Sequence, residues 1–405
     1  MKKSIIFTII ILAAAAAFIA AAVPYLLTDR RETLPENEQR SDASAEGRTA
    51  IPESGSRGTL RIEAETEPLP AASAELQPTA PAEPQSIEIS LLFAGDILLD
   101  PSYAVMAAAL ARGGDSYAEG MYSPELLDLM RSADLFMVNN EFPYSSGGSP
   151  TEGKQYTFRA RPEYVSILSD MGVDLVSLAN NHAYDYGQAA FIDTMDILDE
   201  AGIPRVGGGH DIEEASAAYI YEADGMKIGI LSATQIERTG SPDTRGATED
   251  SPGVFRCMSP DRLVRRISEL KEQVDLVIVY VHWGTESKEE IDSYQRDQAP
   301  LYAAAGADVI IGDHPHILQK IDRVGDCLVF YSMGNYLFNS KTQDSGLAEI
   351  TVDTETKKIV SSRFIPTLQS GCRASLMTGT EKQRVIGYMN GISGVHMDEE
   401  GYIID

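Results

Sequence analysis

Five apolar runs of this sequence each end abruptly in polar side chains. The runs are SIEISLLFAGD, DLFMVNNE, VDLVSLANNH, VDLVIVYVH and ADVIIGDHPH. Short apolar runs bounded in this way are typical of buried strands, and the ligand sites of α/β folds lie beyond the carboxyl ends of such strands. Helical periodicity occurs between them, at residues 102–112, 124–132, 162–171, 187–202, 260–273 and 294–305. The pattern therefore predicts successive β-α units and an α/β fold.

The other patterns of the folded part indicate antiparallel strands. Residues 219–234 alternate around Asp224-Gly225, which predicts a hairpin with a tight turn at that pair. Residues 326–338 and 347–368 are also interpreted as antiparallel strands joined by tight turns. We expect one folded domain over residues 86–370 and a C-terminal extension of uncertain structure over residues 371–405.

The N-terminal segment is apolar enough to enter a membrane. Residues 5–27 contain no charged side chain and, at about 1.5 Å per residue, can span a ~30 Å hydrocarbon core. Their length favours an uncleaved anchor, although Ala20 to Ala22 would also suit cleavage of an export signal. We predict a single-pass cell-membrane anchor in residues 1–28, with the folded domain outside the cytoplasm. Residues 29–85 are rich in Glu, Ala, Pro and Ser, which predicts a disordered acidic linker.

The acidity of the chain excludes some partners. Its formal net charge is −28 and its pI is near 4.5, so no basic excess is available to neutralise nucleic-acid phosphates. An anionic ligand would need metal cations or local basic side chains to overcome this charge. The cysteines Cys257, Cys327 and Cys372 have no metal-binding spacing and are interpreted as packing residues.

Four of the six histidines lie at the ends of the apolar runs, beside carboxylates and amides. In a parallel arrangement the carboxyl ends of strands share one edge, so residues that are scattered through the sequence can converge there. Imidazoles, carboxylates and an amide are ligands that borderline divalent metals accept. The candidate site residues are Asp96, Glu141, Asn181, His182, His282, His314 and His316.

Within this set, the segment His314-Pro315-His316 is the most informative. Proline pushes the preceding residue toward extended backbone angles, and residues i and i+2 of an extended chain face the same way. Both imidazoles would then address one site. The alternative is a pair of surface histidines on either side of a turn proline.

Structural roles also fit several of the other candidates. His282 could be a buried structural histidine with Trp283 packed on it, and the polar residues before residue 187 could cap the next helix. Asp185 could serve as such a cap or could orient an imidazole. Asp313 could be a ligand or a solvated loop residue.

Residues 86–368 contain six motifs in a characteristic order: FAGDILLD, VNNEFP, SLANNHAYDYG, YVHWGTE, GDHPHILQ and YSMGNYLF. In these motifs the sequence resembles the CapA family of poly-γ-glutamate capsule synthesis proteins. That family is similar to the calcineurin-like metallophosphoesterases. The resemblance implies a four-layer αββα sandwich, with a dinuclear metal site at the strand ends.

The resemblance also implies which carboxylates bind metal. Asp96 matches the first metal carboxylate, and Glu141 stands at the position that bridges two metals. The sequence departs from the phosphoesterase motif Asp-x-His, because Leu98 occupies the histidine position. One metal therefore has a ligand fewer, and we expect one or two divalent ions, such as Mn, Fe or Zn.

The resemblance assigns the remaining candidates as well. Asn181 matches an amide ligand, and His182 matches the histidine that assists the leaving group. The other metal positions fall on His282, His314 and His316.

Two hypotheses of function follow. In the first, the protein is a metal-dependent hydrolase or transferase of capsule biosynthesis, and His182 protonates the leaving group. In the second, it is a non-catalytic accessory of polymer binding or export, with a vestigial or structural metal site. Both predict an anionic polymer such as poly-γ-glutamate as partner, together with the membrane and other capsule-synthesis membrane subunits. Lys154, Arg159 and Arg161 are the nearest basic side chains, and they are expected in a solvated loop.

Overall fold

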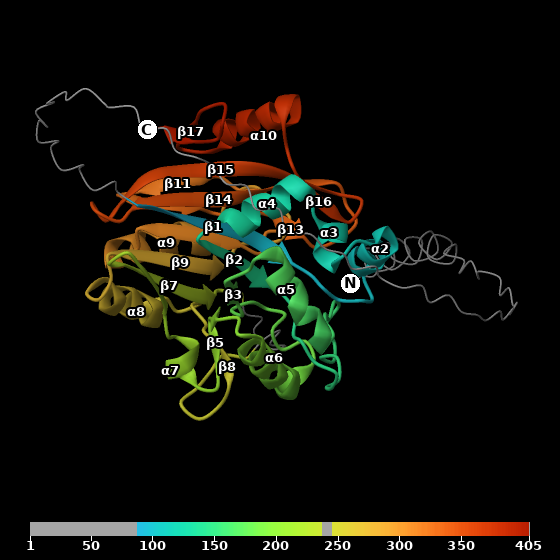
Figure 1. Cartoon of the computed structure of the whole chain (residues 1–405). Helices are drawn as coiled ribbons and strands as arrows, with labels where there is room; N and C mark the ends of the chain where they lie inside the picture. The colour runs from blue at the N-terminus through green and yellow to red at the C-terminus, as the bar shows by residue number, and fades with distance from the viewer. Residues whose placement is uncertain (1–86, 237–244, 405) are drawn as a thin grey trace, which may run out of the picture. The chain divides into compact units, whose positions relative to one another are not determined.

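Two β-sheets pack face to face in the structure, a computed structural model that describes residues 87–236 and 245–404 (Figure 1). The predicted membrane anchor and linker, residues 1–85, lie outside the described residues. Among the helices that are described, none is long and apolar enough to cross a membrane.

The first sheet has eight strands in the order β16-β15-β14-β1-β2-β3-β4, and β13 also pairs with β1. Strands β1 to β4 run parallel, and β14 to β16 continue the sheet as antiparallel neighbours. The strands are β1 (Glu88–Ile97), β2 (Leu135–Asn140), β3 (Leu175–Ser177), β4 (Arg205–Val206), β13 (Asn335–Leu337), β14 (Gln343–Asp353), β15 (Lys358–Ser370) and β16 (Arg373–Leu376).

The second sheet has six strands in the order β11-β12-β10-β9-β7-β6. Strands β7, β9, β10 and β12 are parallel, and antiparallel strands lie at both edges. The strands are β6 (Tyr219–Ala223), β7 (Met226–Thr234), β9 (Leu276–His282), β10 (Val309–Asp313), β11 (Ile321–Val324) and β12 (Cys327–Phe330). Two short pairs complete the β-structure, β5 (Gly208–Gly209) with β8 (Gly253–Val254) and β17 (His396–Met397) with β18 (Ile403–Ile404).

Apolar side chains from the two facing surfaces form one core. Leu91 and Phe93 of β1 lie in the same cluster as Ile278 and Tyr280 of β9. Leu92 belongs to a different cluster, on the outer face, because successive side chains of a strand point to opposite faces. The central strands are therefore buried on both sides, which explains why they read as continuous apolar runs.

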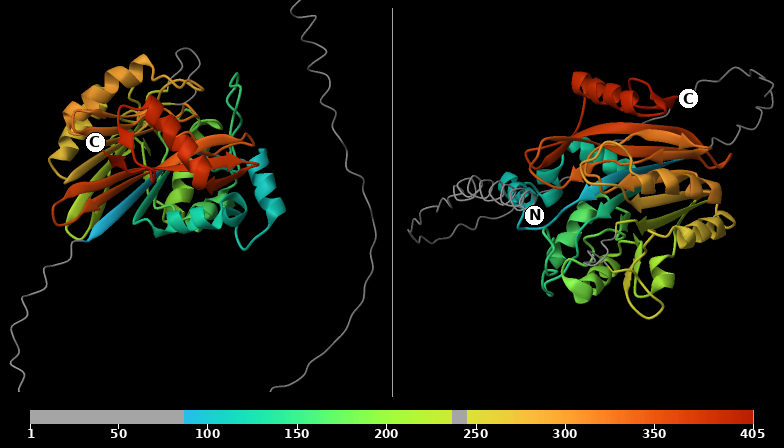
Figure 2. Two further views of the ribbon diagram at one scale, coloured as in Figure 1. Left: turned by 90° about the horizontal axis from the view of Figure 1, so that it is seen from above. Right: turned by 180° about the vertical axis from the view of Figure 1, so that it is seen from behind.

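Helices cover the outer faces of both sheets and make the molecule a mixed α/β sandwich, as the views in Figures 1 and 2 agree. The helices on the first sheet are α2 (Ala104–Arg112), α3 (Tyr117–Met121), α4 (Pro124–Ser132), η1 (Pro162–Val165), α5 (Ser166–Met171) and α6 (Gly187–Ala201). Those on the second sheet are α7 (Ile212–Ala215), α8 (Asp261–Lys271) and α9 (Ser293–Ala305).

The predicted β-α units are confirmed, and so is the hairpin, in which Asp224 and Gly225 both have positive φ at the turn between β6 and β7. The predicted antiparallel strands are confirmed for residues 347–368, where β14 pairs with β15, and only in part for residues 326–338, where β12 is antiparallel to β11 alone. Strand β12 runs parallel to β10, and β13 runs parallel to β1. Strand direction depends on a partner that is distant in sequence, and an apolar run carries no information about that partner.

Residues 371–404, for which the sequence predicted no definite structure, pack against the first sheet. Strand β16 pairs with β15, and helix α10 (Gly379–Ile392) places apolar side chains in the same cluster as Phe364. The amide of Phe364 also donates to the carbonyl of Gly401 at 2.9 Å. The first sheet therefore extends beyond residue 370.

Candidate metal centre

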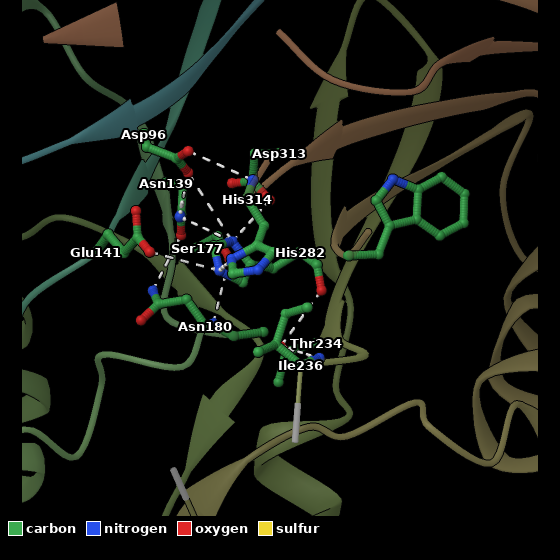
Figure 3. A network of polar contacts seen from close by, with 12 residues as sticks. Asp96, Asn139, Glu141, Ser177, Asn180, Thr234, Ile236, His282, Asp313 and His314 are labelled. Carbon is green, nitrogen blue, oxygen red and sulfur yellow. Dashed lines mark hydrogen bonds and ion pairs between the residues drawn. The ribbon is translucent and has the colours of Figure 1, made fainter. Parts of the chain in front are cut away.

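The candidate residues converge between the two sheets. Strands β1, β2 and β3 of the first sheet and β9 and β10 of the second bring their carboxyl ends to this region, and Figure 3 shows Asp96, Glu141, His282 and His314 pointing toward one another. The sequence predicted convergence at one sheet edge, whereas the structure joins the edges of two sheets. Each parallel β-α series brings its strand ends to one edge, and face-to-face packing brings those edges together.

His282 is the central residue of this site and is fully buried. Its Nε2 lies 2.7 Å from Oδ1 of Asn181, 3.0 Å from Nδ1 of His314 and 3.5 Å from Oε1 of Glu141. Its Nδ1 lies 2.9 Å from Oδ1 of Asp313. Burial lowers the pKa of His282 to about 3, so the ring is neutral and carries a single proton. The contacts on both sides fix the orientation of the ring, as hydrogen-bond partners do for a histidine that binds a metal.

Trp283 does not pack on His282, as it would if His282 were only a structural histidine of the core. Trp283 points away from His282 into the outer core, where it stacks on Tyr302 and Tyr331, and its Nε1 donates to the carbonyl of Tyr331 at 3.0 Å. The tryptophan does not pack on the histidine, because adjacent residues of a strand face opposite sides.

His314 and His316 both face the site, although the predicted reason is wrong. The φ angles of the two residues are +91° and +59°, so neither has the extended backbone that Pro315 was expected to impose. Positive φ is uncommon for residues other than glycine and marks a strained backbone that functional sites retain. The ring centroids are 5.8 Å apart, and His314 is only 5% exposed, so the alternative of two surface histidines is excluded.

Asp96 and His316 form a close pair. Nδ1 of His316 lies 3.1 Å from Oδ2 of Asp96, and Nδ2 of Asn139 donates to Oδ1 of Asp96 at 2.8 Å. Burial would raise the pKa of Asp96, but His316 and its neighbours hold that pKa below the usual value. Although burial acts to lower the pKa of His316, the Asp96 carboxylate raises it. Oδ1 of Asn335 lies 2.8 Å from the same Nδ1 and fixes the ring.

Glu141 lies between His282 and His182, and its carboxyl oxygens accept no hydrogen bond from the described residues. The side chain is fully buried, and neither Oε1 nor Oε2 has a hydrogen-bond partner among the described residues. Oδ2 of Asp313 is in the same state. Burial, and then the charge of Asp96, raises the pKa values of both carboxyl groups well above their ordinary range. Buried groups without partners are costly, and in this position a cation would satisfy them.

The residues fit a divalent metal. Ligand atoms of Glu141, His282 and His314 lie within 4.8 Å of one another, and those of Asp96, Glu141 and His316 form a second such group. The two groups share Glu141, the residue that the family resemblance placed between two metals. Imidazole nitrogens with carboxylate oxygens suit Zn, Mn or Fe, and the oxygen of Asn181 lies beside the first group.

His182 lies at the border of this centre, beside a buried ion pair. Its Nδ1 lies 2.6 Å from Oδ2 of Asp185, and its Nε2 lies 3.9 Å from Oε1 of Glu141. Asp185 also accepts from the amide of Phe158 at 2.7 Å, and burial raises its pKa to about 7. The helix-cap alternative for Asp185 is wrong, because α6 begins after Tyr186 without a side-chain cap. Asp185 instead orients the imidazole.

Lys154 belongs to this arrangement, contrary to the prediction that it lies in a solvated loop. Its side chain is 6% exposed, and its Nζ lies 2.5 Å from Oδ1 of Asp185. The same ammonium donates to the backbone carbonyl of Asn181 at 2.6 Å. Lys154 thus connects two parts of the chain: the segment after residue 150, and the loop that contains Asn181 and His182.

Some site residues were left open or missed by the sequence reasoning. Asp313 is buried against His282, and Asn139 contacts both Asp96 and His282, the latter at 3.3 Å between Nδ2 and Nδ1. Both residues lie at the ends of apolar runs, and this position could have identified them as candidate site residues. A carboxylate oxygen of Glu286 falls within 4.8 Å of ligand atoms of His314 and His316. Glu286 lies outside any strand, so strand-end reasoning could not reach it.

Leu98, the residue at which the sequence departs from the motif of the resemblance, faces the core. Its side chain is fully buried in the cluster on the helix side of the first sheet, and its amide donates to the carbonyl of Leu337 at 3.0 Å. The core occupies the position where the phosphoesterase motif has a histidine.

Comparison with known proteins agrees with the motif resemblance. A family model described as bacterial capsule synthesis protein PGA_cap matches residues 90–340. The PGA biosynthesis protein CapA of Bacillus subtilis (strain 168) is 31% identical over 284 residues, which cover 68% of this chain and 70% of that protein. The capsule biosynthesis protein CapA of Bacillus anthracis is 28% identical over 309 residues, covering 74% of this chain and 72% of that protein.

Among solved structures, one described as a novel phosphatase from Mycoplasma pneumoniae aligns with a TM-score of 0.45 and 16% identity. The alignment covers 71% of this chain and 95% of that one. A likeness of that size says nothing about the reaction. The family match and the Bacillus relatives establish instead that this chain belongs to the PGA_cap family of bacterial capsule synthesis proteins, the CapA-like proteins of poly-glutamate biosynthesis.

Proposed function

We propose that this protein is a divalent-metal-dependent hydrolase or transferase of poly-γ-glutamate or a similar capsule polymer. We further propose that a four-layer αββα fold of the metallophosphoesterase type carries the centre. Residues 5–27 would anchor the chain in the cell membrane beside other capsule-synthesis subunits, with the folded domain outside the cytoplasm. The apolar N-terminal run supports that part of the proposal.

The observation that carries the proposal is the state of Glu141. Its carboxyl group is fully buried, has no hydrogen-bond partner among the described residues and faces the neutral ring of His282. Such a group does not stabilise the fold by itself. It would cost stability unless a cation bound there. The two ligand groups that share Glu141 support one or two ions, held by Asp96, Glu141, Asn181, His282, His314 and His316.

The chain's own residues supply the proton chemistry. A divalent ion bound there would lower the pKa of a water molecule and polarise a phosphoryl or amide oxygen. His182 presents Nε2 toward Glu141, and Asp185 holds its Nδ1, which fixes the ring orientation and stabilises the protonated ring. His182 would then donate its Nε2 proton to the leaving group.

A second function, a non-catalytic accessory of polymer binding or export, is favoured by one observation. Because Leu98 is closed into the core, the group of Asp96, Glu141 and His316 lacks the ligand that the phosphoesterase motif would provide. A Mycobacterium tuberculosis (strain H37Rv) relative, 24% identical over 267 residues, is described as a probable polyglutamine synthesis accessory protein. In this alternative the ion would bind polymer carboxylates without turnover.

Metal analysis and turnover assays on the full-length chain separate these functions. If the protein is an enzyme, His182→Ala should abolish turnover of phosphoester or γ-glutamyl substrates and leave the metal content largely intact, because His182 lies outside both ligand groups. His314→Ala should remove bound metal. The exposed His396, in β17, gives the control His396→Ala, which should change neither quantity. Capsule function that persists in the His182→Ala protein would support the accessory function.

A further inference from the structure

A small polar cavity lies outside the proposed ligand set. It has a volume of about 260 Å³, and its lining includes Ser102, Ser145, Ser146, Arg159, Arg161 and Tyr186. Cavities for drug-sized ligands measure roughly 300–1,000 Å³, so this one suits a group the size of an amino acid. Its lining is almost entirely polar, which suits a charged ligand.

Two arginines make this cavity positive in an otherwise acidic chain. Asp100 also lines it, but this carboxylate is 3% exposed and accepts from the amides of Ser102 and Arg159, each at 2.7 Å. Glu163 lies 3.8 Å from Arg161, and both side chains are more than half exposed. Such a surface pair is weak, so it leaves Arg161 available to a stronger partner.

Contacts within the chain hold Arg159 in position. Its guanidinium lies 4.1 Å from the centroid of the Tyr186 ring, and its Nη1 donates to the carbonyl of Gly147 at 2.8 Å. A guanidinium fixed by stacking and one hydrogen bond loses less entropy when its remaining donors bind a carboxylate. The cavity is thus arranged for a planar anion.

The segment that carries both arginines also contacts the proposed acid. The Phe158 ring packs on the His182 ring with centroids 4.2 Å apart, and the Phe158 amide donates to Asp185. The amide of Ser145 donates to the carbonyl of Ala160 at 3.1 Å. The cavity therefore lies on the His182 side of the centre, on a segment that contacts His182 through Phe158.

We propose that this cavity is a subsite for the free α-carboxylate of a γ-linked glutamate unit, held by Arg159 and Arg161. The inference rests on the proposed function, because it names the substrate chemistry of the same site. A γ-linkage uses the side-chain carboxyl group and leaves one α-carboxylate free on every unit. An arginine fork can recognise that group, while a neighbouring unit of the polymer reaches the centre.

The test is binding of a short γ-linked glutamate oligomer to the metal-loaded full-length chain, measured by calorimetry in a His182→Ala background that preserves the ligand. Arg161→Gln and Arg159→Gln should each weaken the affinity about tenfold or more, since each removes a charge-assisted contact. Arg265→Gln is the matched control. Arg265 is 58% exposed and lies 3.8 Å from Glu269, much as Arg161 is 60% exposed and lies 3.8 Å from Glu163.

The outcomes separate the subsite from the proposed function. If the parent protein binds the oligomer and Arg161→Gln binds it equally well, the subsite is wrong and the proposed function stands. If the parent protein binds no γ-glutamate oligomer, the subsite and the polymer assignment both fail, while metal content and phosphoester turnover still report on the centre. Esterifying the α-carboxylates should abolish the effect of Arg161→Gln, and a persistent effect overturns the carboxylate assignment. The carboxylate assignment is also wrong if polyphosphate of equal charge binds more tightly than the γ-glutamate oligomer and is weakened as much by Arg161→Gln.

Discussion

Replacing Glu141 by glutamine should change the stability of the protein in opposite directions with and without metal. The buried carboxyl group has no hydrogen-bond partner among the described residues, and burial raises its pKa well above the usual value. In the metal-free protein, folding therefore forces this group into an unfavourable state. Glutamine keeps the shape and removes the ionisable group, so Glu141→Gln should stabilise the metal-free fold.

The magnitudes follow from general energetics. Because the pKa of Glu141 is raised, at neutral pH folding must either bury the carboxylate charge or protonate it, at a cost of about 1–3 kcal/mol, and glutamine removes this cost without metal. A ligand present at a thousand times its dissociation constant stabilises a fold by about 4 kcal/mol. The variant should lose most of that gain, because a neutral amide is a weaker ligand than a carboxylate. At about 2–4 °C per kcal/mol for a domain of a few hundred residues, both differences are measurable.

Thermal unfolding of the full-length chain, in chelator and in excess divalent metal, measures both effects. The variant should melt above the wild type in chelator and below it in metal. The exposed Glu355, in the turn between β14 and β15, gives the control Glu355→Gln, which should match the wild type in both conditions. A variant that melts lower in chelator and gains as much from metal as the wild type would refute the role assigned to Glu141.

Three further changes test individual features of the structure. Lys154→Met should lower the free energy of unfolding by about 3–5 kcal/mol, because it leaves the buried Asp185 carboxylate without its ammonium partner, and denaturant titration measures the loss. Leu98→His should cost roughly 1–3 kcal/mol and leave the bound metal per chain unchanged, because the position faces the core; elemental analysis gives the metal count. Asp275→Asn should cost under about 1 kcal/mol at neutral pH. The Lys227 amide, and then Lys357, lower the pKa of Asp275. Its contribution to stability is therefore present above the ordinary pKa of 3.8 and is lost as the pH falls through the lower pKa of the folded state.

Matched controls distinguish these effects from general damage. Lys358→Met and Asp326→Asn change exposed residues, and Leu110→His changes a leucine that is 56% exposed, so all three should leave stability nearly unchanged. Equal losses for Lys154→Met and Lys358→Met would contradict the ion-pair argument. A gain of bound metal in Leu98→His would show that the position reaches the centre. A pH-independent loss in Asp275→Asn would rule out the charge as its cause.

The order of elements and most site residues could be predicted from the sequence. Apolar runs and helical periods are local, so strands such as β1 and β9 and helices such as α6 were expected close to their observed positions. The polar residues at the strand ends were found for the same reason. Strand direction was not predictable for β12 and β13, because it depends on partners far away in the chain.

The details of the site depended on contacts that no local pattern encodes. Lys154 was expected in a solvated loop, yet it is buried because Asp185, 31 residues later, supplies a carboxylate. Asp313 gained a definite role only when β9 placed His282 beside it. The positive φ angles of His314 and His316 differ from what the proline between them predicted.

The sequence by itself determined the family, the alternation of strands and helices, and the set of chemical groups available to a metal. These follow from residue type and spacing, which can be read without knowledge of the fold. The tertiary structure alone decided that two sheets, and not one edge, enclose the centre, that Glu141 is buried without a hydrogen-bond partner among the described residues, and that Leu98 faces the core. Whether a side chain is buried, and which side of a sheet it faces, depends on which elements pack together. That packing is a property of the whole domain and not of any local segment.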